Sequence, residues 1–456
     1  MTQTALAQHH PHVGIQPVPL SERTLGMWGT FVLWADLGIS FLVMVVGMFL
    51  VPGLGFSHAL LAILVGAVIG NTLLGLGAVI GSATGLPTMV LLRAPLGIRG
   101  SYAPTVINVL QLIGWAALEV IVMAQAADML ATRFLGLPGA YPIWVVLFTA
   151  LGTLMAISGP VAVTKRWLQK VAVWAVLAST LWLTYAVLTQ GDTSALSRPG
   201  TGEMPFWLAV DLVVALPISW FPLVADYSRF SRSQPVAFWG TSLGYFVPHV
   251  WFYALGAALV LALGVQGDPS APIAPLLAAV AGLTAGGFAL LVLLVDETDE
   301  AFANLYSSAV SVQNIVPTAG LRTIVLGISA IVLVIALAIP LAQYESFLLL
   351  IGSIFIPLFG VLAADYFVLR NRQYQADELL RGDGAYAFTG GVHWAGIATW
   401  LIGIAVYLGI SGLPAFGVVG LAPTLGASLP SFIASFGLYL LLGRLSVVRP
   451  LAVGGQ

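Results

Sequence analysis

The sequence predicts an all-α membrane protein with twelve transmembrane helices, built as a five-plus-five inverted repeat with two additional C-terminal helices. Hydrophobic residues make up 59% of the 456 residues and charged residues only 7%, whereas soluble domains carry about 25% charged residues. The mean hydropathy is +1.00. Apolar runs long enough to cross a bilayer recur along the whole chain. Two of them are interrupted five spans apart, which is the pattern of an inverted repeat.

Composition also excludes several classes of function. The formal net charge is −2, and no basic cluster predicts a nucleic-acid partner. The chain has no cysteine, which excludes disulfides, thiolate metal sites and cysteine nucleophiles. No glycine loop followed by lysine is present to hold a phosphate, and the six histidines lack metal-ligand spacing. We therefore expect neither an enzyme nor a bound cofactor.

Twelve apolar runs have about the length of a membrane span of roughly 20 residues. They are residues 27–50, 57–80, 104–130, 141–157, 167–188, 207–226, 236–264, 286–312, 323–341, 346–368, 394–410 and 424–442. The run 273–283 is too short to span and predicts an interfacial or re-entrant helix.

The repeat then divides the chain into predicted regions. These are a disordered cytoplasmic tail (1–24), the first repeat (25–190), the second repeat (205–370), the last two spans (391–444) and a second cytoplasmic tail (445–456).

Basic residues predict the orientation. If both termini are cytoplasmic, all but two of the sixteen Lys and Arg residues lie on the cytoplasmic side, the exceptions being Arg133 and Arg198. The positive-inside rule requires such a bias. We therefore expect a protein of the cytoplasmic (inner) membrane with both termini in the cytoplasm.

The interrupted spans are the first and the sixth. WADLGIS, residues 34–40, places the charge of Asp36 and the flexible Gly38 in mid-span. LPISWFP contains Pro217 and Pro222, each of which removes a backbone donor. Harmless kinks are one interpretation, because Gly and Pro are frequent in membrane helices. The interval of five spans favours the other, a LeuT-like transporter with its site at the midplane.

The eighth span carries the most unusual stretch, LVDETDEAFANLYSS (294–308), because charged residues at membrane depth normally face a cavity or an ion path. At about 100° per residue, it offers two polar surfaces. One holds Val295, Thr298, Asp299 and Phe302, and the other holds Asp296, Glu300, Asn304 and Ser307. We expect one surface to serve a coupling cation and the other a polar organic substrate. Asp36 could help to bind the coupling cation. Alternatively, it could only accept hydrogen bonds from backbone amides that the helix break leaves unpaired.

The third span carries a polar stripe at helical spacing, formed by Asn108, Gln111, Trp115 and Glu119. Trp115 could stack a flat heterocycle while Glu119, one turn away, accepts N–H donors from the ring edge. A lone Trp is also typical of core packing or of an interfacial anchor. Trp220 lies between the two prolines and is the second candidate for an aromatic wall of the substrate site. Alternatively, it packs against the first span.

The motifs together resemble a known family. SATGLPTMVLLRAPLGIRGSYAP followed by NVLQLIGW, the segment PISWFPLVADYSRF, and TDEAFANLYSSAVSVQN are similar to the nucleobase:cation symporters, which include cytosine permeases and hydantoin transporters. The resemblance covers nearly all twelve spans. The amino-acid sequences of the last two motifs are most similar to those of the branch assigned to hydroxymethylpyrimidine, a thiamine precursor. The cytosine permeases are the next most similar branch.

The resemblance implies roles for individual residues. Trp115 matches the family's stacking tryptophan, Glu119 the polar position one turn later, and Asn304 the substrate-binding asparagine. The family's sodium site implies backbone carbonyls near Ala35 and Gly38, with Val295, Thr298 and Asp299 of the eighth span. A hydroxyl is usual where Asp299 stands, so the coupling ion, Na⁺ or H⁺, stays open.

The expected function is therefore a secondary active transporter that imports a pyrimidine-type base, hydroxymethylpyrimidine or cytosine, by cation symport and alternating access. Its expected substrate residues are Trp115, Glu119, Trp220, Asn304, Glu300 and Gln111. We expect it to act as a monomer in the lipid bilayer. An amino-acid or amine symporter of the same fold is an alternative. A channel or a sensor is another, although no filter segment or signalling domain is visible.

Overall fold

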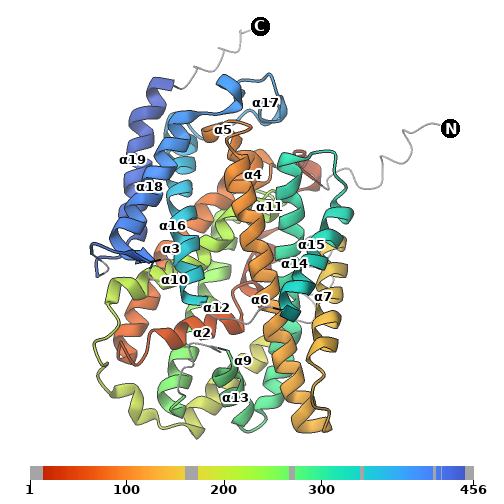
Figure 1. The fold of residues 1–456 in the computed structure, drawn as a ribbon, viewed down its shortest axis with the longest axis vertical. Coiled ribbons are helices and arrows are strands. Elements are labelled where there is room, and N and C mark those ends of the chain that lie inside the picture. The colour runs from red at the N-terminus through yellow and green to blue at the C-terminus, as the bar shows by residue number, and fades with distance from the viewer. Residues whose placement is uncertain are drawn as a thin grey trace, which may run out of the picture.

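The computed structural model describes residues 14–159, 173–265, 273–338, 344–413, 417–422 and 424–446. Long helices run along the long axis of the molecule and pack side by side (Figure 1). The strands β1 (Gly412–Leu413) and β2 (Val418–Val419) form one short antiparallel pair. Within the described residues the secondary structure is thus almost entirely helical, as predicted for an all-α membrane protein.

The helices have the following bounds. The first part of the chain contains α1 (Met27–Asp36), α2 (Phe41–Phe49), α3 (Phe56–Thr84), α4 (Thr88–Leu91), α5 (Arg93–Leu96), α6 (Tyr102–Leu135), α7 (Tyr141–Ser158) and α9 (Val173–Gln190). The second part contains α10 (Phe206–Trp220), α11 (Val224–Ser228), α12 (Gln234–Leu263), α13 (Ala274–Gly282), α14 (Gly286–Ile315), α15 (Leu321–Ala338), α16 (Tyr344–Ala363), α17 (Ala376–Leu380), α18 (Trp394–Ser411) and α19 (Ser428–Ser446). Short 3-10 turns η1 (Leu20–Glu22), η3 (Thr193–Ser197), η4 (Phe221–Leu223) and η6 (Thr389–Gly391), and the π-helix η5 (Ala364–Leu369), lie between them.

Many of these helices can cross a membrane. Among the described residues, eight helical segments are long and apolar enough to do so, and the bent pair α1 and α2 makes nine. Helices α9, α14 and α19 lie at the three other predicted spans. The predicted interfacial run is the short helix α13. Parts of two predicted spans, residues 167–172 and 339–341, lie outside the described residues.

The two predicted interruptions differ. The break in the first span is confirmed, because α1 and α2 meet at a bend of 60°. The sixth span is not opened: α10 continues through Pro217 to Trp220 and passes through η4 into α11. Pro222 occupies the first turn of η4, where its missing N–H removes no helix bond. The prediction of a fully broken sixth span is therefore wrong, and a tightened 3-10 turn takes its place.

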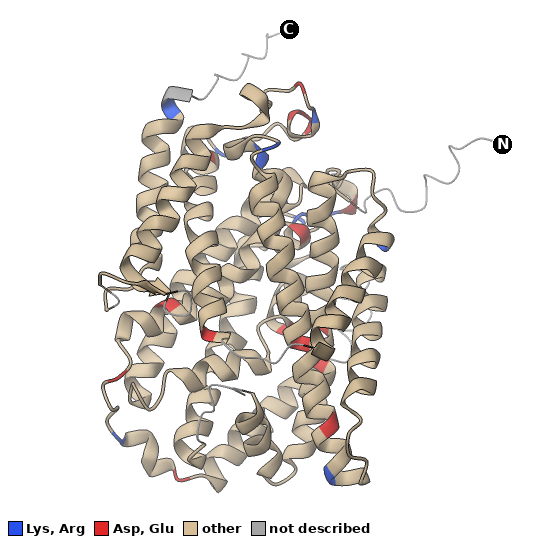
Figure 2. Cartoon of the chain, in the orientation of Figure 1, with Lys and Arg blue, Asp and Glu red and all other residues tan. Residues whose placement is uncertain are grey.

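Basic and acidic residues are distributed differently along the bundle. In Figure 2 the Lys and Arg segments lie toward the two ends of the bundle, whereas acidic segments also lie halfway along it. Lys165, Arg166 and Lys170, which the orientation argument used, lie outside the described residues. The buried acids include Asp296, Glu297, Asp299 and Glu300 of the stretch that the sequence predicts to be functional, together with Asp36 and Glu119.

Part of the predicted N-terminal tail is ordered. Val18 is buried and its amide donates to the carbonyl of Gly85 at 3.0 Å. The fully buried Arg229 donates to the carbonyl of Gly14 at 2.6 Å, and Arg23 donates to that of Val18 at 3.0 Å. Residues 14–24 thus differ from the predicted disordered tail, because buried apolar and guanidinium groups hold them. Residues 1–13 and 447–456 of the two predicted tails lie outside the described residues.

Close helix packing positions the centre of the bundle. α14 packs along α6, and α12 packs against α1, α2 and α3. A Cβ on Gly256 of α12 would lie 2.0 Å from the Met44 carbonyl oxygen, and one on Gly47 of α2 would lie 2.1 Å from that of Tyr253. Only glycine allows this approach, as is common between membrane helices. These contacts hold α2 directly against α12.

Candidate functional site

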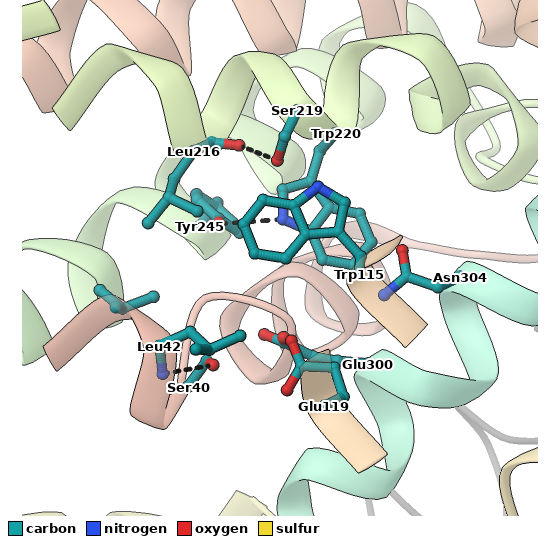
Figure 3. A pocket seen from close by; sticks show the side chains of 11 residues that line it. Ser40, Leu42, Trp115, Glu119, Leu216, Ser219, Trp220, Tyr245, Glu300 and Asn304 are labelled. Atoms are coloured by element: carbon teal, nitrogen blue, oxygen red, sulfur yellow. Dashed lines mark hydrogen bonds between the residues drawn. The ribbon is translucent and has the colours of Figure 1, made fainter. Parts of the chain in front are cut away.

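A cavity lies where the broken first span faces α6, α10, α12 and α14 (Figure 3). Its lining combines aromatic rings, carboxylates and small polar groups: Ser40, Leu42, Val43, Trp115, Glu119, Leu216, Ser219, Trp220, Tyr245, Glu300 and Asn304. Its volume is only about 10 Å³, which is about the least that holds one water molecule. The side chains are therefore closely packed, and a ring-sized ligand requires them to move apart.

The predicted aromatic walls both line this cavity, but they are held differently. The Trp220 indole donates to the Tyr245 hydroxyl at 3.0 Å and meets Trp34 edge to face at 6.1 Å. Trp115 meets Tyr344 at 5.8 Å and Phe347 at 5.2 Å, again edge to face. Among the described residues, no acceptor binds the Trp115 indole N–H, although this nitrogen is buried. Trp220 is thus fixed by a hydrogen bond, and Trp115 by packing alone.

Three glutamates form a cluster at the floor of the cavity, hereafter the Glu cluster. Glu119 of α6 and Glu297 and Glu300 of α14 are all buried, and their carboxylate oxygens lie within 4.8 Å of one another. Figure 3 shows the carboxyl groups of Glu119 and Glu300 pointing toward the same space. Like charges this close cannot all stay ionised without a cation or bound protons. The cluster can therefore hold a cation or a hydrogen-bond donor.

Glu297 links this cluster to the broken span. One of its oxygens accepts from the Phe41 amide, and the other accepts from the Ser40 hydroxyl at 3.3 Å. Phe41 is the first residue of α2, and Ser40 caps that helix by accepting from the Leu42 amide at 3.1 Å. Unpaired amides and the helix dipole make such a terminus favourable for a carboxylate.

Three aspartates form a second cluster at the break, hereafter the Asp cluster. Asp36 at the end of α1 lies with Asp296 and Asp299 of α14, their oxygens within 4.8 Å of one another and all three buried. Within the described part of the chain, no Lys, Arg or His forms an ion pair with the Glu cluster. The two acidic clusters lie buried together in the middle of the bundle.

The other predicted cation residues lie near the Asp cluster or beside it in the chain. Ala35 and Gly38 flank Asp36 at the break, where the Asp36 carbonyl accepts from the Ile39 amide at 2.9 Å. The Thr298 hydroxyl donates to the Val295 carbonyl at 2.7 Å. The Val295 side chain is 40% exposed. A cation at these residues stays a prediction.

Gln111 is the one predicted substrate residue outside the cavity lining. Its amide nitrogen donates to Asn108 at 2.9 Å and to the backbone carbonyl of Ser219 at 3.1 Å. Asn108 in turn donates to Ser311 of α14 at 2.9 Å. Gln111 thus supports the turn between α10 and η4 that carries Trp220.

Sequence reasoning missed several contributors. Glu297 lies on neither surface proposed for the eighth span, and Asp296 groups with Asp299 rather than with Glu300. Helix geometry could have predicted both groupings. Residues three apart are neighbours on a helix, so residue 296 pairs with 299 and residue 297 pairs with 300. Ser40 had the signal of an N-cap residue. Tyr245 gave no distinct signal, because its span also carries Thr241, Ser242 and His249, and only the tertiary fold brings it to Trp220.

Comparison with known proteins places the chain among permeases. Residues 17–428 match a family described as permeases for cytosine/purines, uracil, thiamine and allantoin. The hydantoin permease of Microbacterium maritypicum is 26% identical over 407 residues, covering 86% of this chain and 82% of that protein. The cytosine permease of Escherichia coli K12 is 28% identical over 405 residues, covering 85% and 87%.

Solved structures agree on the fold. A nucleobase-cation-symport-1 family transporter in a closed conformation with bromovinylhydantoin bound has a TM-score of 0.81 at 23% identity, covering 96% of this chain and 95% of that one. The inward-facing conformation of the same transporter has a TM-score of 0.77 at 22% identity, covering 95% and 93%. This agreement over nearly the whole of both chains confirms the predicted fold class.

Proposed function

Since the chain belongs to the family of permeases for cytosine/purines, uracil, thiamine and allantoin, we propose that it imports a pyrimidine-type base by cation symport. Alternating access around the central cavity is the proposed mechanism. Hydroxymethylpyrimidine and cytosine are the proposed substrates.

The observation that supports this substrate class is the meeting of Trp115, Trp220 and Glu119 in one cavity. Indole rings offer flat apolar faces for stacking, and such aromatic contacts contribute about 0.5–1.5 kcal/mol beyond burial. Glu119 and Glu300 accept N–H donors from a ring edge, and the Asn304 amide can donate and accept. A flat heterocycle with N–H donors satisfies all of these groups together.

Glu119 also favours an aminopyrimidine over uracil. An ionised carboxylate only accepts hydrogen bonds, so it selects a ring edge that presents donors. Hydroxymethylpyrimidine and cytosine carry an exocyclic amine, and uracil does not. A buried polar group left unpaired by the wrong ligand produces strong discrimination. Uracil is therefore expected to compete poorly despite its similar size.

The Asp cluster is the proposed place of the coupling ion. Asp36 and Asp299 lie where the broken span meets α14, and broken helices supply cation ligands in transporters of this kind. Ala35, Gly38, Val295, Thr298 and Asp299 are the proposed cation residues. Carboxylates there can bind Na⁺ as oxygen ligands or carry H⁺, so both ions are candidates.

The proposed location is the inner membrane, with both termini cytoplasmic and the monomer as the working unit. The amino-acid alternative has less support, because a substrate carboxylate needs a partner and the described cavity lining contains two carboxylates but no basic side chain. An amine remains compatible with the same lining.

Uptake into proteoliposomes tests the proposal. Radiolabelled hydroxymethylpyrimidine, cytosine, uracil, hydantoin and thiamine are offered with and without an inward Na⁺ or H⁺ gradient. We expect the two aminopyrimidines to accumulate and uracil to compete weakly, and we expect Glu119→Gln to narrow that gap. Uracil competing as well as cytosine in the unmodified protein would contradict the role of Glu119.

A further inference from the structure

We infer that the cavity recognises its ligand as a flat organic cation with an amidinium-type edge, in which a positive charge is shared by adjacent N–H donors. This inference rests on the proposed function and specifies the charge of the substrate. The argument comes from the charge balance of the cavity, its donors and acceptors, and its aromatic walls.

The charged side chains of the described cavity lining are all acidic. Glu119 and Glu300 line the cavity and Glu297 lies behind them, while the lining contributes no basic side chain. Uncompensated buried charges are costly, so bound protons or a cation must offset the charge of these carboxylates. A neutral base donates hydrogen bonds and leaves this role to protons, whereas a cationic ligand takes it directly.

The hydrogen-bonding groups also favour a cationic ligand. Glu119 is fully buried, and among the described residues no amide, hydroxyl or basic group donates to either of its oxygens. This differs from Glu297, which the N-terminus of α2 already binds. The Glu119 oxygens lie within 4.8 Å of those of Glu297 and Glu300, so the Glu119 carboxyl can share a proton with these neighbours or accept hydrogen bonds from a ligand. Two parallel N–H donors on a delocalised cation match a carboxylate in the bidentate geometry that gives strong, specific pairs.

The walls are suited to a positive ring. Trp115, Trp220 and Tyr245 all border the cavity, and the faces of aromatic rings attract cations, with Trp the most favourable. An amidinium group conjugated to a ring is flat, so it can stack between such walls while its edge meets the carboxylates. A tetrahedral ammonium ion lacks this shape. The structure thus favours a protonated amino-heterocycle or a similar planar cation.

Benzamidine and benzamide form a matched pair of probes. Both are flat and nearly equal in size, but benzamidine carries an amidinium at neutral pH and benzamide is neutral. We expect purified protein to bind benzamidine about tenfold or more tightly than benzamide, because hydrogen bonds to charged groups are the stronger kind. Thermal stabilisation against ligand concentration measures binding without requiring transport.

Two cavity variants test whether the preference for benzamidine depends on the glutamates of the lining. Glu119→Gln and Glu300→Gln, each tested separately in case one fails to fold, are expected to reduce the preference for benzamidine. Glu203→Gln, in an exposed loop, serves as the matched control and should keep it. Equal binding of the two probes, or a preference that survives both cavity variants, would overturn the inference.

The same experiment separates this inference from the proposed function. Benzamidine binding that depends on Glu119, without uptake of any pyrimidine, refutes the pyrimidine assignment and supports the cationic site. Uptake of cytosine or hydroxymethylpyrimidine with no preference for benzamidine supports the pyrimidine assignment and refutes the cationic site.

Discussion

Trp115 shows how a single residue can be part of the packed interior and still be available to a ligand. Its ring packs against Tyr344 and Phe347 of α16, yet its indole N–H meets no acceptor in the described structure. Trp220 has no such freedom, because Tyr245 binds its N–H. Of the two walls, Trp115 is therefore the one whose indole N–H can donate to a ligand without first breaking a hydrogen bond.

Replacing Trp115 with Ala is expected to weaken substrate binding by about 1–3 kcal/mol through lost area and stacking. Equilibrium binding to purified protein measures this change. Trp239→Ala is the control, since Trp239 of α12 is 51% exposed and lies outside the cavity. If Trp115→Ala is folded and binds with unchanged affinity, Trp115 is a packing residue only.

Asp299 decides the coupling ion in the proposed scheme. Asp299→Asn keeps the shape of the side chain and removes its charge, so sodium dependence should fall more than substrate affinity in saturating sodium. Uptake against sodium concentration measures the first, and binding at high sodium the second. Asp383→Asn, whose carboxylate is 81% exposed, is the control. Symport that ignores sodium but dissipates an imposed pH gradient would instead make Asp299 a proton carrier.

Helix α14 shows what periodicity alone can predict for an element. The four acids predicted a functional helix at this point, and they do lie buried in mid-bundle. The division into two surfaces grouped Asp296 with Glu300 and left out Glu297, but α14 is buried on nearly every side between residues 296 and 311. Its clusters are therefore set by which neighbour supplies the third carboxylate, Asp36 or Glu119, and this depends on tertiary packing.

The two interrupted spans show how far helix breaks can be predicted from sequence. A glycine beside a charge in mid-span predicted the break between α1 and α2, where the chain has alternative partners for its free amides. Prolines predicted a second break that did not form, because the turn at η4 tolerates Pro222, and the Val213 carbonyl, four residues before Pro217, accepts from the Tyr253 hydroxyl at 3.4 Å. Sequence reveals a lost backbone donor, but not whether another side chain compensates for it.

The close contact of α2 with α12 provides a stability test at this scale. Gly256→Ala places a Cβ against the Met44 carbonyl, so we expect about 1–3 kcal/mol of destabilisation from overpacking. Thermal unfolding of the purified protein measures it. Gly437→Ala in α19 is the matched control, because no heavy atom lies within 4 Å of the added Cβ. Equal stability of the two variants would show that α2 can shift without cost.

For the whole molecule, composition and span length were sufficient to predict an all-α membrane protein, because the bilayer leaves few alternatives to helices. The ordered N-terminal segment was not predictable in this way. Its polar composition resembles that of a flexible tail, and only the fold places Arg229 and Gly85 where Gly14 and Val18 can meet them.

The proposed orientation has a direct test, since the chain contains no cysteine. Thr201→Cys lies in an exposed loop near Arg198, and Asp377→Cys lies in exposed α17 at the opposite end. In intact cells, a membrane-impermeant maleimide should label the first variant and reach the second only after permeabilisation. The reverse pattern would place both termini outside the cytoplasm.

The contact between Glu297 and the N-terminus of α2 has a thermodynamic consequence. The broken span contributes Asp36 to one cluster and binds Glu297 of the other through Phe41 and Ser40. Occupancy of either cluster can thus alter the affinity of the other, and the coupling free energy must be reciprocal. Whatever factor the ion adds to substrate affinity, the substrate must add to ion affinity, and Ser40→Ala should diminish both factors equally.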